Sequence, residues 1–219
     1  MRMGKSFFAA LSIGIVLSTG TSCTPDELQQ SQQNRQWEQG KTYGQWHLAF
    51  DGHGAVTGND DSVTMYPKSA EDASVTHACL VHTDKEFGEK VDFEITVNTE
   101  EQVRKGEPNP WEVGWVLWNY EDNNRFYALA LKPNGWELSK QDPAYPGAQR
   151  FLASGHEPTF ALNQEHRVHV IHEGTTMRFF ANGQQLGEFT DEESPYFGGA
   201  IGLYTEDARV TFTDLKTYN

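Results

Sequence analysis

Two carboxylates stand two residues apart in the run Lys90 to Val97, where Asp92 and Glu94 alternate with apolar residues. A β-strand rises about 3.3 Å per residue, so both side chains would lie on one face of a strand, roughly 6.5–7 Å apart. Carboxyl groups that flank a glycosidic bond in hydrolases lie roughly 5–9.5 Å apart. The spacing therefore permits catalysis with Asp92 or Glu94 as the acid/base. The alternative is that both belong to the solvated face of an ordinary strand.

Aromatic residues are concentrated in one third of the chain. They are Trp111, Trp115, Trp118, Tyr120, Trp136 and Tyr145. The apolar face of a sugar ring packs well on an aromatic plane that has amides and acids nearby. The alternative for these rings is core packing, which we expect for Trp115 and Trp136. We expect Trp118, Tyr120 and Tyr145 to be exposed.

Short runs of alternating apolar and polar residues would position these side chains. The runs cover 46–50, 62–66, 75–82, 90–97, 113–120, 126–132, 136–140, 167–172, 177–181, 200–204 and 209–218. Turn signals such as Pro133-Asn134-Gly135 and Asn182-Gly183 separate them. Period-two alternation with hairpin turns predicts an all-β, antiparallel sandwich or barrel.

Two stretches resemble a known superfamily. Residues 92–140 contain DFEITVN, GWVLWNYEDNNRFYALAL and PNGWELSK, and residues 166–218 contain HRVHVIHEG, FFANGQ and GGAIGLYTEDARVTFTDLKTY. Both are similar to concanavalin A-like jelly rolls, among them laminin-G-like domains, glycoside-hydrolase-16-like domains and the bacterial 3-keto-disaccharide hydrolase domain. The resemblance implies a two-sheet antiparallel jelly roll over residues 44–219. Its members include lectins, binding modules, hydrolases and lyases, so the fold alone does not choose a function.

The resemblance also implies which side chains would face a ligand. Those expected between the sheets are Trp115, Leu117, Tyr127, Leu129 and Leu131. Those expected on the concave sheet, where the superfamily holds sugars, are Val116, Trp118, Tyr120, Phe126, Ala128 and Lys132. The irregular stretch 142–151 predicts a loop at the rim that carries Tyr145, Gln149 and Arg150.

A structural calcium ion is a further implication of the resemblance. Jelly rolls of this superfamily often hold Ca²⁺ with an Asp on the last strand, and Asp214 in VTFTDLKTY matches that position. Phe212 and Leu215 are both apolar although three residues apart, which predicts a bulge that re-aims Asp214. Ca²⁺ takes six to eight oxygen ligands, and Asp51 could supply another. The alternative is a capped turn without metal.

The N-terminus has the pattern of an exported protein. Arg2 and Lys5 precede the apolar run 7–17, which is too short to span a bilayer, so residues 1–22 are predicted to be a signal peptide. Small residues lead to Cys23, which predicts lipidation there, with ordinary cleavage as the alternative. Residues 23–43 are polar and predict a tether.

The composition restricts the partners. A net charge of −14 repels phosphate backbones, so nucleic acid is excluded, and strongly acidic polysaccharides are disfavoured. Cys79 is expected to be a small buried apolar residue, and we expect a monomer. The leading hypothesis is an exported carbohydrate-binding domain. The alternatives are a glycoside or keto-sugar hydrolase that uses Asp92 and Glu94, and a structural or adhesion surface lipoprotein.

Overall fold

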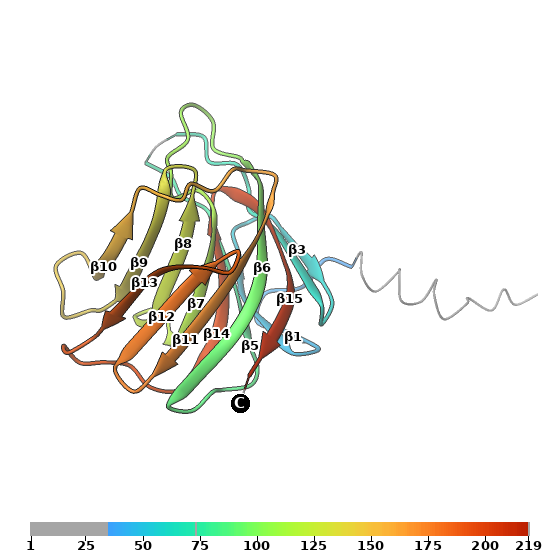
Figure 1. The fold of residues 1–219 in the computed structure, drawn as a ribbon. Helices are drawn as coiled ribbons and strands as arrows, with labels where there is room; N and C mark the ends of the chain where they lie inside the picture. The colour runs from blue at the N-terminus through green and yellow to red at the C-terminus, as the bar shows by residue number, and fades with distance from the viewer. Residues whose placement is uncertain (1–34, 73, 219) are drawn as a thin grey trace, which may run out of the picture.

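The computed structural model describes residues 35–72 and 74–218 (Figure 1). They form two antiparallel sheets packed face to face, and this part of the chain contains no helix. Across these residues no helix is long and apolar enough to cross a membrane. The predicted all-β, two-sheet antiparallel architecture is therefore confirmed. The signal peptide, residues 1–22, and Cys23 lie outside the described residues.

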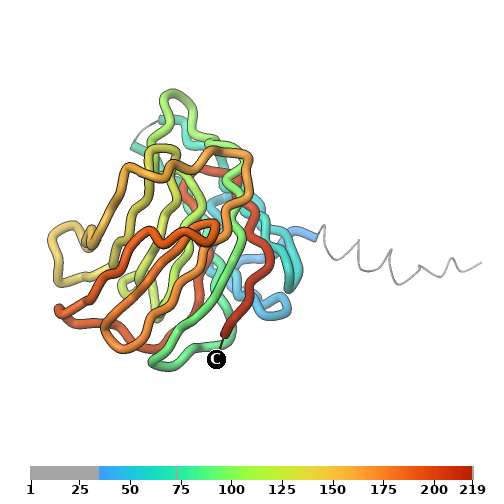
Figure 2. Tube along the Cα trace, in the orientation of Figure 1, coloured from blue at the N-terminus to red at the C-terminus, as the bar shows by residue number. Residues whose placement is uncertain are grey.

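The eight-stranded sheet has the order β1-β2-β5-β14-β7-β8-β9-β10, and the seven-stranded sheet has the order β13-β12-β11-β6-β15-β4-β3. Figure 2 lets the reader follow the chain as it passes between the two sheets. The strands are β1 (Thr42–Tyr43), β2 (Trp46–Asp51), β3 (Ala55–Gly58), β4 (Ser62–Tyr66), β5 (Ala78–Thr83), β6 (Lys90–Gln102), β7 (Gly114–Asp122), β8 (Arg125–Lys132), β9 (Gly135–Gln141), β10 (Gln149–Gly155), β11 (Glu165–Glu173), β12 (Thr176–Ala181), β13 (Gln184–Thr190), β14 (Ala200–Glu206) and β15 (Ala208–Thr217).

The alternation along β6 shows how the sequence builds a sheet. Val91, Phe93, Ile95 and Val97 are buried between the sheets, and the residues between them are only partly buried. Since side chains alternate with a period of two, a shift of one residue would turn the apolar set to solvent, which fixes the register. β6 consequently pairs with β11 on one side and with β15 on the other.

The core between the sheets contains large apolar side chains from both layers. Examples are Trp46, Leu48, Met65, Phe93, Trp118, Tyr127, Leu129, Trp136, Phe179 and Phe212. Trp136 packs edge-on against Phe179, with ring centroids 5.2 Å apart, which confirms its expected core position. Cys79 is a buried free thiol in the same core, as expected, and burial raises its pKa.

The expected facing of β7 is wrong. Trp118 pairs with Tyr127, whose ring centroid lies 5.7 Å away, and it is fully buried between the sheets. Val116 also lies in this core, whereas Trp115 and Leu117 belong to a separate apolar cluster on the outer face of the eight-stranded sheet. The expected inward positions of Tyr127, Leu129 and Leu131 on β8 are confirmed.

A bulge at Asn119 explains the altered phase of β7. Between the pairs Trp118–Tyr127 and Asp122–Arg125 the register shifts, and Asn119 has a φ of 49°, which asparagine tolerates better than most residues. Its side-chain amide donates to the Gly198 carbonyl at 2.8 Å and its oxygen lies 2.9 Å from Nδ1 of His172. The bulge therefore places Trp118 and Tyr120 on opposite faces of the sheet.

Two boundaries differ from those expected. Gln149 and Arg150 begin β10, so the expected rim loop ends at residue 148. Trp37, within the predicted tether, is buried, stacks on Tyr43 with ring centroids 4.8 Å apart, and donates its backbone N–H to Val56. The folded unit therefore begins before residue 44.

A buried ion pair lies within the core. The ammonium group of Lys140 is 2.6 Å from the carboxylate of Asp191 and also donates to the carbonyl oxygens of Glu193 and Ser194. The hydroxyl of Tyr127 donates to the same carboxylate at 2.6 Å. Burial opposes ionisation of Asp191, but hydrogen bonds from Lys140 and Tyr127 outweigh it, so the pKa of Asp191 is lowered.

Candidate functional site

A groove of about 410 Å³ crosses the outer face of the eight-stranded sheet. Paired residues of neighbouring strands form its floor, because Gly202 pairs with Leu117, Leu117 with Ala128, and Ala128 with Ser139. The groove is lined by Phe50, Leu80, Trp115, Leu117, Asn123, Phe126, Ser139, Gln141, Gly147, Gln149, Tyr204 and Glu206. In the order of the sheet, these residues come from β2, β5, β14, β7, β8, β9 and β10, with Asn123 from the β7–β8 turn and Gly147 from the loop before β10. The groove therefore runs across the strands.

Small residues along the floor create this hollow. A Cβ atom at Gly202 would lie 3.0 Å from the Cβ of Leu117, so even an alanine would crowd the floor. Ala128 and Ser139 continue the row of short side chains on β8 and β9. Larger side chains at these positions would fill the space that a ligand needs.

Aromatic rings form one wall. Trp115 and Tyr204 meet edge-on with ring centroids 5.8 Å apart, and Phe50 meets Tyr204 at 6.5 Å. The indole N–H of Trp115 donates to the Trp111 carbonyl at 2.9 Å, which fixes the plane of its ring. Trp115 is thus a rigid apolar surface beside the groove.

The expected ligand residues separate into three groups. Phe126 and Gln149 line the groove. Tyr120 is on the expected outer face but is 8% exposed, with its hydroxyl donating to Asn123 at 2.9 Å, so its expected exposure is wrong. Trp118 cannot reach a ligand, because its side chain is fully buried in the core.

The remaining expected residues do not line the groove, and Arg150, which pairs with the core residue Lys140, faces the other side of the sheet. Lys132 is buried, 3.0 Å from Glu137, with its ammonium group 4.4 Å from the ring centre of Trp111. Arg150 lies 2.9 Å from Glu193, and its guanidinium group covers the ring of Tyr145 at 5.3 Å. Tyr145 is 47% exposed, as expected for a residue of the rim loop.

Sequence analysis missed the contribution of β14. Tyr204 and Glu206 line the groove, and Gly202 lies on the same face of this strand beside Leu117. The alternation was visible in AIGLYTE, but the expected strand ended at residue 204 and left Glu206 outside it. Trp115 was missed for another reason, since it was assigned to the core by the wrong phase of β7.

Glu206 lies at one end of the groove. The Tyr204 hydroxyl donates to its Oε1 at 2.5 Å. Burial raises the pKa of Glu206; the hydrogen bond from Tyr204 acts in the opposite direction, and the negative charge of Asp207 adds to the rise. A partly buried carboxylate that keeps one oxygen uncommitted is a hydrogen-bond acceptor for a bound molecule.

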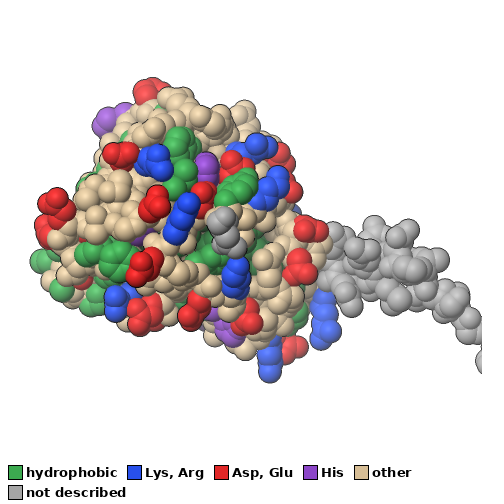
Figure 3. All heavy atoms as spheres, turned by 60° about the horizontal axis from the view of Figure 1, so that its bottom comes forward, with side chains coloured by type: hydrophobic (Ala, Val, Ile, Leu, Met, Phe, Trp, Pro, Cys, Tyr) green, Lys and Arg blue, Asp and Glu red, His purple; other side chains and the backbone are tan. Residues whose placement is uncertain are grey.

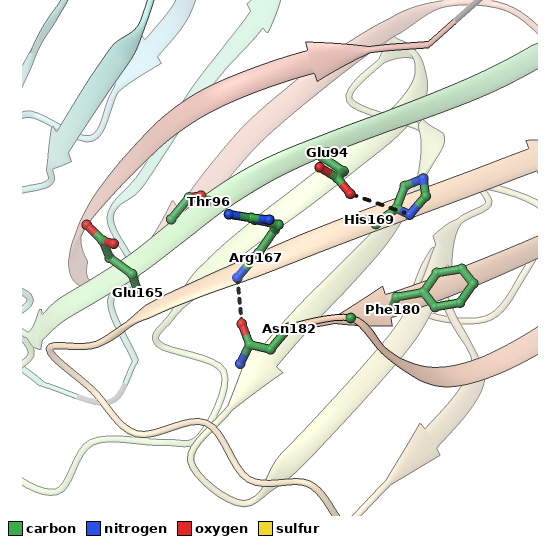
Figure 4. Close-up of a pocket in the computed structure, with 8 residues that line it drawn as sticks. Glu94, Thr96, Glu165, Arg167, His169, Phe180 and Asn182 are labelled. Carbon is green, nitrogen blue, oxygen red and sulfur yellow. Dashed lines mark hydrogen bonds and ion pairs between the residues drawn. The ribbon is translucent and has the colours of Figure 1, made fainter.

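Asp92 and Glu94 lie on the other sheet. A depression of about 570 Å³ lies on the outer face of the seven-stranded sheet. Figure 4 shows the residues that line it, which are Glu94, Thr96, Glu165, Arg167, His169, Phe180, Asn182 and Gly183. The two carboxylates share one face of β6, as their spacing predicted. They are separated from the groove by both sheets and the core between them.

His169 occupies the space between the two carboxylates. Its Nε2 lies 2.9 Å from Asp92 and its Nδ1 lies 3.8 Å from Glu94. The Tyr218 hydroxyl donates to Glu94 at 3.0 Å, and the ring of Phe180 stacks on His169 at 5.3 Å. Both carboxylates therefore already have partners within the protein.

The expected calcium donors do not fit together. Asp214 has a φ of 57° at a register shift in β15, which confirms the bulge, and its backbone N–H donates to Asp61 at one end of β4. Asp51 belongs to a turn beside Tyr66 and Pro67, at the other end of β4, about 13 Å away by strand rise. Among residues 35–72 and 74–218, no three His, Cys, Asp or Glu side chains converge on a metal position.

The class of fold follows from this architecture. The two antiparallel sheets form a concanavalin A-like, lectin-type jelly roll, as the resemblance implied. No protein-family model matches the sequence, and no curated protein sequence matches it.

Particular solved structures share this fold. The carbohydrate-binding module CBM66 from Bacillus subtilis aligns with a TM-score of 0.61 over 81% of this chain and 98% of the module, at 12% identity. A Bacillus subtilis protein of unknown function with a galectin-like fold aligns with a TM-score of 0.56 over 79% of this chain and 88% of that protein, at 14% identity. The exoplasmic/lumenal domain of VIP36, in a Ca²⁺/Man3GlcNAc-bound form, aligns with a TM-score of 0.52 over 80% of this chain and 84% of that domain, at 10% identity.

Proposed function

We propose that this protein binds a glycan in the groove across the outer face of the eight-stranded sheet. The observation that carries the proposal is the combination of aromatic and uncharged polar side chains along one hollow. Phe126, which is partly buried, and the small exposed part of Trp115, 6% of its surface, offer apolar contact for the C–H faces of sugars. Ser139, Gln141 and Gln149 offer hydroxyl and amide groups for sugar hydroxyls. A volume of about 410 Å³ is within the range of small-molecule sites.

Two further observations support this function. The carbohydrate-binding module and the sugar-bound VIP36 domain have the same fold. A purely structural or adhesive surface would not need a hollow floored by Gly202 and Ala128 and walled by aromatic rings. We place the exposed Tyr145 at the rim, where it would contact sugars that extend beyond the groove.

Binding should be tested with an array of neutral hexasaccharides followed by calorimetry. We expect Trp115→Ala to weaken binding by about 1–3 kcal/mol, the range measured when aromatic platforms for stacked rings are removed. Phe180→Ala is the matched control, because it removes an aromatic ring from the depression on the opposite sheet. Wild-type protein that binds no oligosaccharide, or a loss of affinity in Phe180→Ala and not in Trp115→Ala, would reject the proposed site.

Glycoside or keto-sugar hydrolysis by Asp92 and Glu94 is the second candidate function. Its support is the open depression beside Glu94, with an imidazole and a guanidinium group in reach. Release of reducing ends that is lost in Glu94→Gln but kept in Trp115→Ala would favour this function. The position of His169 argues against it, because the ring is hydrogen-bonded to Asp92, lies 3.8 Å from Glu94 and fills the space that a scissile bond would need.

We also propose that the domain is displayed outside the cytoplasm, through a signal peptide over residues 1–22 and a lipid on Cys23. The basic start, the apolar run 7–17 and the small residues before Cys23 support this. Membrane fractionation of wild type and Cys23→Ala tests it, since loss of the lipid should release the protein. Calcium has no role in the proposed binding, because Asp51 and Asp214 lie at opposite ends of β4.

A further inference from the structure

The groove contains a single kind of charge. Of the twelve described residues that line the groove, Glu206 is the only one whose side chain is charged at neutral pH. The others have apolar, amide or hydroxyl side chains or are glycine. The Tyr204 hydroxyl engages one of its oxygens. A ligand that reaches this end of the groove therefore meets a carboxylate.

Lys132, a cation on the groove side of β8, already has an acidic partner, because its ammonium group is 3.0 Å from Glu137. Arg150, 2.9 Å from Glu193, and Arg125, 3.1 Å from Glu121, lie on the side of the sheet that carries Lys140 and Tyr196, and they are paired as well. These pairs keep the cations from neutralising a carboxylate on a ligand.

Arg104 comes nearest to Glu206 but is shared by two other acids. Its guanidinium group is buried, pairs with Glu112 and lies 2.5 Å from Asp207. Two more of its hydrogen bonds go to the carbonyl oxygens of Asp72 and Val75. Arg104 therefore has no free donor for Glu206, and the cluster around this end of the groove has an excess of negative charge.

We propose that Glu206 determines the charge specificity of the groove: it accepts hydrogen bonds from hydroxyl or amino groups of a bound sugar and excludes sugars that carry a carboxylate at this position. This inference rests on the proposed glycan binding in the groove. A carboxylate accepts from paired hydroxyls and attracts an ammonium group, whereas two carboxylates in contact repel each other. The ligand class is thus neutral or amino-bearing oligosaccharides, and uronic and sialic acids are rejected.

The experiment compares matched probes on the full-length mature protein. Cellohexaose is compared with its C6-oxidised form, in which primary hydroxyls become carboxylates, and chitohexaose with its de-N-acetylated form. We expect the oxidised probe to bind at least about tenfold more weakly than cellohexaose and the amino form to bind more tightly than chitohexaose. Both differences should shrink as salt screens the charges.

The variant Glu206→Gln keeps an oxygen acceptor for Tyr204 and removes the charge. It should reduce the preference for cellohexaose over its oxidised form to less than about threefold and should abolish the preference for the amino form. Glu173→Gln is the control for the overall field, because it removes an equal charge from an exposed position on β11 of the other sheet and should keep the wild-type ratios. Melting curves confirm that both variants fold.

The possible results distinguish a failure of charge selection by Glu206 from a failure of glycan binding in the groove. If Glu206→Gln retains the wild-type ratios while Trp115→Ala loses affinity, the groove binds glycans but Glu206 does not select them, and this inference is overturned. If Glu173→Gln changes the ratios as much as Glu206→Gln, the specificity comes from the field of the whole protein, and this inference is overturned. If the wild-type protein binds none of the probes, the proposed function and the inference fail together.

Discussion

Trp115 and Trp118, three residues apart on β7, point to opposite sides of the eight-stranded sheet: Trp115 borders the groove and Trp118 is fully buried in the core. The two tryptophans therefore serve different purposes. Trp115→Ala should weaken ligand binding and also lower stability, since only 6% of the Trp115 surface is exposed, whereas Trp118→Ala should act on folding alone.

Trp118→Ala should reduce the free energy of unfolding by about 3–5 kcal/mol, because it removes a large buried side chain and leaves a cavity beside Tyr127. At roughly 2–4 °C per kcal/mol, the melting temperature should fall by about 6 °C or more. Calorimetric titration of the folded fraction should give the wild-type affinity for cellohexaose. A stable Trp118→Ala variant with weakened binding would contradict the assignment of Trp118 to the core.

Lys140→Met should destabilise the fold strongly. It would leave the Asp191 carboxylate buried without its cation, and breaking a buried pair in this way costs about 3–5 kcal/mol. Urea denaturation followed by tryptophan fluorescence measures the change. Lys105→Met is the control, since Lys105 and Glu71 form an exposed pair and its loss should barely move the midpoint. Equal midpoints for the two variants would show that the buried pair is unimportant.

Stability should depend on His172 between mildly acidic and neutral pH. Burial lowers the pKa of His172 to about 4, from an ordinary value of 6.5, so the folded state holds it neutral while the unfolded state protonates it. Its contribution is fully present above pH 6.5 and is lost as the pH falls toward about 4, by about 3 kcal/mol in total.

His172→Gln removes this titration and keeps an amide that can bond to Asn119. Melting temperatures at several pH values should therefore fall less steeply with acid in the variant than in the wild type. Parallel curves for the two proteins between pH 4 and 6.5 would mean that His172 does not titrate on unfolding.

Calcium should leave the stability unchanged. The separation of Asp51 from Asp214 leaves too few carboxylate oxygens at either place for an ion that takes six to eight ligands. Melting curves in EDTA and in millimolar Ca²⁺ should therefore coincide. A rise of several degrees that chelator removes and Asp214→Asn abolishes would show that Asp214 and neighbouring carbonyl oxygens bind the ion without Asp51.

Alternation in the sequence was enough to predict the fold class and most strands. Runs such as 90–97 have one apolar face, and the sheet that results buries that face. Strands β3 and β10 were not predicted, because AVTG is short and the irregular stretch 142–151 predicted a loop. Each lies at the edge of its sheet, where pairing with one neighbour determines the strand and burial contributes less.

The candidate site was harder to predict, because it depends on which face of the sheet each side chain takes and on pairing between strands that are distant in the sequence. The bulge at Asn119 reverses the facing of aromatic residues that strict alternation places together. The groove also needs β14 beside β7, a pairing of residues more than eighty positions apart that no local pattern reports. Acidic and basic side chains are interspersed over the face in Figure 3, so charge pattern alone would not have located the site either.

The buried thiol of Cys79 has a consequence for how this domain can be followed in solution. β5 lies inside the eight-stranded sheet, between β2 and β14, and the thiol is held against the Asp51 carbonyl at 3.0 Å. An alkylating reagent can reach it only after these central strands separate, since local fraying at the edge strands leaves it covered. The rate of Cys79 alkylation therefore reports how often the central strands of the sandwich separate, and the measurement needs no added label.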